Sequence, residues 1–131
     1  MKLYFTDTGL CCYLMGLNSP EMVYGTPFSG QLFETFAVME ILKSHWHNGR
    51  SPEFFYYRDS GNAEIDLIIS ENGCLHPVEI KQTGSSGKDD ARHFSVLAEA
   101  GEKTSYGSVV CLTDKPRAIT DNANAISIWN I

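Results

Sequence analysis

Four charged residues in the sequence have types and positions that suit chemistry on a phosphate group: Glu34, Asp66, Glu79 and Lys81. Glu79 and Lys81 are two residues apart in a strand-like segment, so their side chains should point to the same side. Asp66 lies among aliphatic residues, where a carboxylate is costly to bury unless it is paired or bound to a metal. If the two segments pair, Asp66 approaches Glu79, and a divalent cation would remove the repulsion between them.

The reaction that these residues suit is metal-assisted hydrolysis of a phosphodiester. Asp66 and Glu79 offer the hard oxygen ligands that Mg²⁺ or Mn²⁺ prefers, and the backbone carbonyl of Ile80 is a third candidate ligand. Lys81 is expected to orient the attacking water and to offset charge on the phosphate. Glu34 falls on an apolar arc of its expected helix, needs a partner there, and is expected to act through a water.

Each of these residues also has a simpler structural interpretation. Asp66, Glu79 and Lys81 would serve equally as ion pairs at a sheet edge, and Glu34 as an acid near a helix N-terminus, where the helix dipole favours it. Arg58 follows a run of aromatic residues and would either bind a phosphate near the site or form a structural salt bridge. The residues by themselves leave both interpretations open.

The elements that must position these residues alternate between helix and strand. A helix is expected over residues 30–47, with Ser29 as its cap. Strands are expected at 54–58, 63–69 and 75–81, joined by turns at 59–62 and 71–73. A second helix is expected over 88–100, and further strands at 108–112 and 125–129. A meander followed by a helical crossover predicts an α/β fold with a mixed central sheet flanked by helices.

The segment before the first helix has weaker signals. Residues 2–5 are typical of a short strand, and residues 10–15 of one or two helical turns. Residues 18–27 contain two prolines and a glycine and are therefore expected to form a loop.

The segments that carry the charged residues resemble a known nuclease pattern. Glu34 and the runs Gly61–Asp66 and Val78–Lys81 resemble the PD-(D/E)XK nuclease-like superfamily, which includes restriction endonucleases, Holliday-junction resolvases and RecB-type nucleases. A closer resemblance is to the C-terminal domain of unknown function of prokaryotic AAA-type ATPases. The segments that carry this closer resemblance are Lys2–Leu10, Gly30–Glu34, Tyr56–Arg58 and Glu79–Lys81.

The resemblance implies a restriction-endonuclease-like core and a single nuclease-like domain over residues 1–131, in which residues 1–29 are an N-terminal extension that packs on the core. It implies that the chain is the C-terminal portion of a longer ATPase, with Mg²⁺ or Mn²⁺ as cofactor and DNA as substrate. An alternative is a catalytically inactive module that binds nucleic acid or protein and regulates the ATPase. A third option is a scaffold for oligomerisation through exposed apolar ends.

Composition limits the other classes of protein. The chain has 131 residues, a formal net charge of -6 and 43% hydrophobic residues, which is typical of one globular domain. The acidic balance argues against coating nucleic acid by bulk charge. No apolar run reaches the roughly 18–20 residues that span a bilayer, so no membrane association is expected. The start lacks a signal-peptide pattern and the four cysteines lack zinc-site spacing, which favours a cytoplasmic location.

Overall fold

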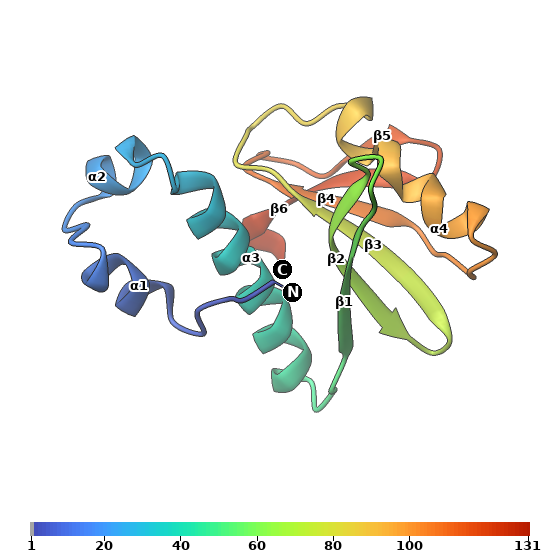
Figure 1. The fold of residues 1–131 in the computed structure, drawn as a ribbon, viewed down its shortest axis with the longest axis horizontal. Coiled ribbons are helices and arrows are strands. Elements are labelled where there is room, and N and C mark those ends of the chain that lie inside the picture. The colour runs from blue at the N-terminus through green and yellow to red at the C-terminus, as the bar shows by residue number, and fades with distance from the viewer. Residues whose placement is uncertain (1) are drawn as a thin grey trace.

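A computed structural model describes residues 2–131, and within this range six strands form one mixed sheet (Figure 1). The strands are β1 (Glu53–Arg58), β2 (Glu64–Glu71), β3 (Cys74–Ile80), β4 (Gly107–Cys111), β5 (Arg117–Thr120) and β6 (Ala123–Ser127). Their order in the sheet is β1-β2-β3-β4-β6-β5. Strands β1 to β3 form an antiparallel meander, β3, β4 and β6 run parallel, and β5 pairs antiparallel with β6. The predicted mixed α/β fold is confirmed.

Helices cover both faces of this sheet. Helix α3 (Ser29–His47) packs on one face and buries an apolar cluster with the sheet. This cluster includes Ala37, Val38, Ile41, Leu67, Val78, Ile80 and Val110. The 3₁₀ helix η1 (Lys88–Phe94) and the short helix α4 (Ser95–Glu99) cover the other face. The second cluster includes Ile65, Ile68, Ala91, Phe94, Leu97, Val109 and Ala125. Burial of these two clusters against water is the main source of stability.

Two short helices precede α3 and lie away from the sheet (Figure 1). In α1 (Thr8–Leu14), the Asp7 side chain accepts a hydrogen bond from the amide of Leu10. In α2 (Pro20–Gly25), Ser19 caps the helix and Pro20 occupies its first turn. The expectation of a loop over 18–27 was therefore wrong, because a serine cap followed by proline is a helix-start signal. Residues 2–5, expected as a strand, do not join the sheet.

Three further elements differ from the sequence-based expectations: the start of α3, the type of the second helix and the number of C-terminal strands. Ser29 begins α3 instead of capping it, and its hydroxyl donates to the side-chain oxygen of Gln82. The single helix expected over residues 88–100 is a 3₁₀ helix followed by one short α-helix. The sequence pattern does not separate the two, because both helix types place apolar residues on one side. The C-terminal region forms β5 and β6 where one strand was expected. Strand β5 was missed because it is four residues long with a largely exposed burial pattern.

The two hairpin turns use residues that tolerate positive φ. Between β2 and β3, Asn72 and Gly73 have φ of 54° and 71°. Between β1 and β2, Asn62 has φ of 65°. Two consecutive residues in the left-handed region are the mark of a tight hairpin turn. The turn at Asn72 and Gly73 sets the register of β2 against β3, and thereby decides which side chains of the two strands meet.

Candidate functional site

Asp66 and Glu79 lie side by side across the β2–β3 pair. The register pairs Leu67 with Val78, so continuing it by one residue places Asp66 opposite Glu79. The backbone amide of Ile80 donates a hydrogen bond to Asp66 Oδ2 over 3.0 Å. The structure therefore brings together the two carboxylates that the sequence proposed as metal ligands. The part of Ile80 that contacts Asp66 is its amide, whereas the sequence proposed its carbonyl as a ligand.

Lys81 pairs with the second of these carboxylates. Its Nζ lies 2.7 Å from Glu79 Oε1. Burial raises the pKa of Glu79, the nearby charge of Asp66 raises it further, and Lys81 only partly offsets both effects. Burial alone would lower the pKa of Lys81, but the hydrogen bond and the charge of Glu79 raise it above its ordinary value. Lys81 is therefore an ammonium at neutral pH.

A second charged group surrounds Lys2, which sequence reasoning did not place in the site. Lys2 Nζ lies 3.1 Å from one oxygen each of Glu34, Glu64 and Asp66. The Tyr4 hydroxyl also donates to Glu34 Oε1, over 2.7 Å. Glu34 is thus linked to Asp66 through Lys2, and no direct contact with Glu79 or Lys81 is present among residues 2–131.

These bonds change the proton affinity of the Lys2 and Tyr4 side chains. Burial would lower the pKa of Lys2, but the charge of Asp66 and the hydrogen bonds to three carboxylates raise it well above its ordinary value. Burial raises the pKa of Tyr4, and the hydrogen bond to Glu34 raises it further. Both side chains therefore keep their protons at neutral pH.

Arg58 lies at the rim of the group. Its Nε is 3.8 Å from Glu64 Oε2, and its side chain is 66% exposed. A contact of this length between partly exposed groups stabilises the fold by less than about 1 kcal/mol. Arg58 thus makes the structural ion pair that the sequence left open. Its exposure also keeps the guanidinium accessible to an anion.

An irregularity in β2 aims the side chain of Asp66. Phe55 pairs with Ile68 and Tyr57 with Ile65, so β2 contains one residue more than β1 in this stretch. Ile65 and Ile68 both belong to the cluster under η1, while Leu67 belongs to the cluster under α3. Regular alternation would put positions 65 and 67 on one face. The β-bulge at positions 66 and 67 breaks this alternation and turns Asp66 towards Lys2.

Sequence reasoning missed Lys2, Tyr4 and Glu64. Alternation in the opening segment was an available signal, because Lys2 and Tyr4 are polar while Leu3 and Phe5 between them are apolar. In the structure Leu3 and Phe5 are exposed, whereas Lys2 and Tyr4 reach the acidic residues. Glu64 is two residues from Asp66, and both contact Lys2.

The donor set suits a hard cation with few protein ligands. Within residues 2–131, no three His, Cys, Asp or Glu side chains lie close enough together to hold a metal ion. Mg²⁺ keeps several waters, however, and usually binds through one or two carboxylates together with substrate phosphates. Asp66 and Glu79 supply such a pair. Two adjacent carboxylates, of which Glu79 has its pKa raised by burial, would gain from a shared cation.

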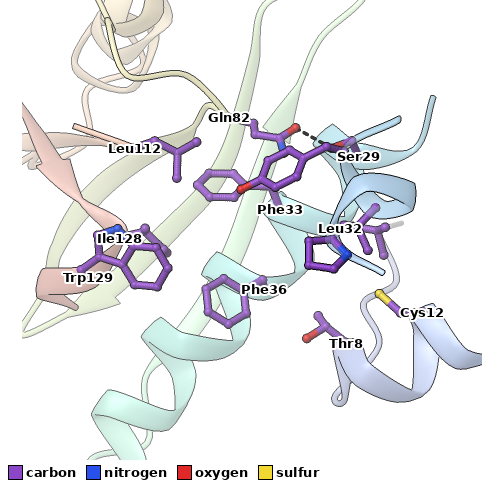
Figure 2. A pocket seen from close by; sticks show the side chains of 13 residues that line it. Thr8, Cys12, Ser29, Leu32, Phe33, Phe36, Gln82, Leu112, Ile128 and Trp129 are labelled. Atoms are coloured by element: carbon purple, nitrogen blue, oxygen red, sulfur yellow. Dashed lines mark hydrogen bonds between the residues drawn. The ribbon is translucent and has the colours of Figure 1, made fainter. Parts of the chain in front are cut away.

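An apolar groove of about 290 Å³ lies apart from these charges (Figure 2). It runs between the α1–α2 region, α3 and the C-terminal 3₁₀ helix η2 (Ile128–Asn130). Its walls include Leu32, Phe33, Phe36, Leu112, Ile128 and Trp129. The hydrogen bond from Ser29 to Gln82 lies at one side of it. Its lining includes none of the site residues proposed from the sequence, so the charged cluster and the groove are separate features.

One family model and two curated proteins match the chain. Residues 29–131 match the family described as "Domain of unknown function (DUF4143)". Uncharacterized proteins of Mycobacterium bovis and Mycobacterium tuberculosis are each 29% identical to the chain over 84 residues. These matches cover 64% of the chain and 18% of each relative, so they span about a fifth of the relatives' length. No solved structure matches the chain significantly. Within residues 2–131, no helix combines the length and hydropathy needed to cross a bilayer.

Proposed function

The chain belongs to the DUF4143 family, and from this premise we propose that it is a PD-(D/E)XK nuclease-like domain that hydrolyses DNA phosphodiesters with Mg²⁺ or Mn²⁺. The observation that carries the proposal is Asp66 opposite Glu79, with Lys81 Nζ 2.7 Å from Glu79 Oε1. Two carboxylates and one ammonium at the end of a strand pair are the groups that this reaction needs. A helix, a three-stranded meander, a helical crossover and a parallel strand agree with a restriction-endonuclease-like core.

The roles follow from the protonation and positions of the side chains. Asp66 and Glu79 would hold the cation, with the Ile80 carbonyl as a further ligand. When bound, a divalent cation supplies an acidified water and stabilises negative charge. Lys81 is protonated at neutral pH, so it donates to a phosphate oxygen and does not serve as a base. Glu34 acts from the side of Lys2 as a positioning residue, since it reaches Asp66 only through that ammonium.

We also propose which longer protein carries the domain and in which compartment it acts. We place it as the C-terminal domain of a prokaryotic AAA-type ATPase in the cytoplasm, acting on DNA that the ATPase engages. All four cysteines are free thiols, which agrees with a reducing compartment. Arg58 is exposed at the rim and would meet a backbone phosphate of the substrate.

The test is cleavage of single- and double-stranded DNA in Mn²⁺ by four variants. We expect Asp66→Asn, Glu79→Gln and Lys81→Met each to lower the rate about 100-fold or more, since each removes a ligand or a charge that acts on the phosphate. Glu99→Gln, at an exposed position in α4, is the matched control and should cleave like the wild type. Undiminished cleavage by Lys81→Met would contradict its role.

A catalytically inactive regulatory module is the second candidate. It is favoured by the occupation of Asp66 by Lys2, which gives the acidic cluster a counter-charge without any metal. This candidate predicts a wild-type protein that binds a protein or nucleic-acid partner with equal affinity in Mn²⁺ and in EDTA, and that leaves DNA intact under both conditions.

A further inference from the structure

The Lys2 ammonium sits at the centre of a set of carboxylate oxygens. Its Nζ is 3.1 Å from Glu34 Oε1, 3.1 Å from Glu64 Oε1 and 3.1 Å from Asp66 Oδ1. A lysine ammonium has three N–H donors, so each donor has one carboxylate oxygen to meet. All three contacts are ion pairs, and those with Glu34 and Asp66 are also hydrogen bonds. The three acids are thus arranged around an ammonium.

The bound ammonium obstructs a metal at Asp66. Asp66 Oδ1 accepts from Lys2, and Oδ2 accepts from the Ile80 amide. A cation shared by Asp66 and Glu79 needs an Asp66 oxygen, and would then lie within a few ångströms of the Lys2 positive charge. In a partly buried site that repulsion is weakly screened.

The segment that carries Lys2 is held to the domain through the side chains of Lys2 and Tyr4. Residues 2–6 belong to no helix or strand. Leu3 is 81% exposed and Phe5 is 48% exposed, whereas Lys2 and Tyr4 make the side-chain hydrogen bonds of this segment and Tyr4 also packs against the apolar cluster under α3. The segment also lies outside residues 29–131, which match the family. The ammonium therefore reaches the acidic residues from a stretch without regular secondary structure that is anchored by two side chains, Lys2 and Tyr4.

We propose that residues 2–6 form an autoinhibitory latch, in which the Lys2 ammonium occupies the acidic cluster and must withdraw before a divalent cation binds Asp66 and Glu79. This rests on the proposed function, because it presumes that the two carboxylates bind a metal. The latch and the metal exclude one another at Asp66 Oδ1. Closing the latch keeps the domain free of metal without unfolding it.

The first experiment measures Mn²⁺ binding by calorimetry at neutral pH for the wild type and variants at Lys2. Lys2→Met removes the competing charge, and we expect its Kd for Mn²⁺ to fall about tenfold or more. Lys2→Arg keeps the charge and should bind like the wild type. The matched control is Lys43→Met, since Lys43 pairs with Glu40 on α3 away from the cluster. Its Kd should stay unchanged.

Thermal unfolding of the same proteins gives a readout that is independent of activity. Without metal, Lys2→Met should melt below the wild type, because three acids lose their counter-charge. Adding Mn²⁺ should raise its melting temperature more than that of the wild type. If Lys2→Met does not fold, Lys2→Gln retains hydrogen bonding without charge and carries both measurements.

A third experiment measures the chemical reactivity of Lys2 in the wild-type protein and therefore needs no substitution. Acetylation of lysine amines, read by mass spectrometry, should be slow at Lys2 and should speed up at Lys2 when Mn²⁺ is added. Lys88, which is exposed, should react at one rate throughout. Equal Mn²⁺ affinity in the wild type and Lys2→Met overturns the latch and leaves the proposed function standing. Absence of Mn²⁺ binding in every variant overturns both.

Discussion

At the scale of single residues, Asp66 joins two groups of charges that are otherwise separate. One of its oxygens accepts from Lys2 and the other from the Ile80 amide, beside the Glu79–Lys81 pair. Four carboxylates (Glu34, Glu64, Asp66 and Glu79) therefore face the ammoniums of two lysines and the more distant Arg58. Excess negative charge in a partly buried place favours cation binding and opposes stability.

Tyr4→Phe tests how firmly the N-terminal segment is held. The Tyr4 hydroxyl donates to Glu34 over 2.7 Å, and a hydrogen bond to a charged group is worth about 1.5–3 kcal/mol. We expect the free energy of unfolding to fall by about that amount, as measured by urea denaturation. Tyr24→Phe, at an exposed position on α2, should leave it unchanged. An equal effect of both changes would mean that the bond to Glu34 contributes nothing.

Glu79→Gln should stabilise the protein at neutral pH. Burial raises the pKa of Glu79, so the folded state favours its protonated form, and ionisation as the pH rises through that pKa destabilises the fold. Glutamine resembles the protonated form, so the melting temperature should rise by roughly 2–4 °C at pH 7.

The advantage of Glu79→Gln should shrink as the pH falls towards 4, where Glu79 itself becomes protonated. Scanning calorimetry at several pH values measures this trend. Glu99→Gln serves as the control, because Glu99 is exposed on α4. A lower melting temperature for Glu79→Gln at pH 7 would show that the ion pair with Lys81 outweighs desolvation.

At the scale of elements, strong local sequence patterns predicted the positions of helices and turns correctly, whereas short elements with weak patterns were missed. The helix expected over 30–47 is α3, and the hairpin at Asn72 and Gly73 forms with both residues at positive φ. Strand β5 and helix α2 were missed, because they are short and carry few buried residues. The bulge at Asp66 has no local signature, since it depends on how β1, β2 and both faces of the sheet pack together.

Gly107→Ala tests how tightly β4 packs against η1, and Gly30→Ala in α3 is the comparison. A Cβ at Gly107 would overlap the ring of Phe94, so Gly107→Ala should destabilise the protein by about 1–3 kcal/mol. A Cβ at Gly30 in α3 meets nothing within 4 Å, so Gly30→Ala should stabilise it by about 0.5 kcal/mol. Urea denaturation of both variants measures the difference. A neutral Gly107→Ala would mean that Phe94 moves aside without cost.

At the scale of the whole molecule, the site assembles from segments that are distant in sequence. Lys2 and Asp66 are 64 residues apart, and Lys2 and Glu34 are 32 apart. The approach of Asp66 to Glu79 was predictable, because one hairpin joins their strands. The position of Lys2 was not, since it depends on how residues before α3 return across that helix. The composition predicts the net negative charge of the chain, but it does not predict that several carboxylates gather around Lys2.

Alkaline pH should weaken the fold through Lys2 and Tyr4. The pKa of each is raised in the folded state, so the folded state holds these protons when the unfolded chain has released them. Their contribution is complete below the ordinary values of 10.5 for Lys2 and 10.0 for Tyr4, and is lost as the pH rises beyond them. Urea denaturation from pH 8 to 11 should show this loss. It should be smaller in Lys2→Met, and an identical slope would contradict it.

The place of β6 in the sheet has a consequence for synthesis on the ribosome. Strand β6 lies between β4 and β5, so β4 stays an open edge until residues 117–127 have left the exit tunnel. An open edge of an apolar strand such as Gly107–Cys111 is a template for pairing with other chains. The nascent domain can close its sheet only after nearly all of its residues are made. A chain that ends before β6 would leave β4 as an exposed edge strand, whereas a chain whose β6 has left the exit tunnel can pair that strand with β4.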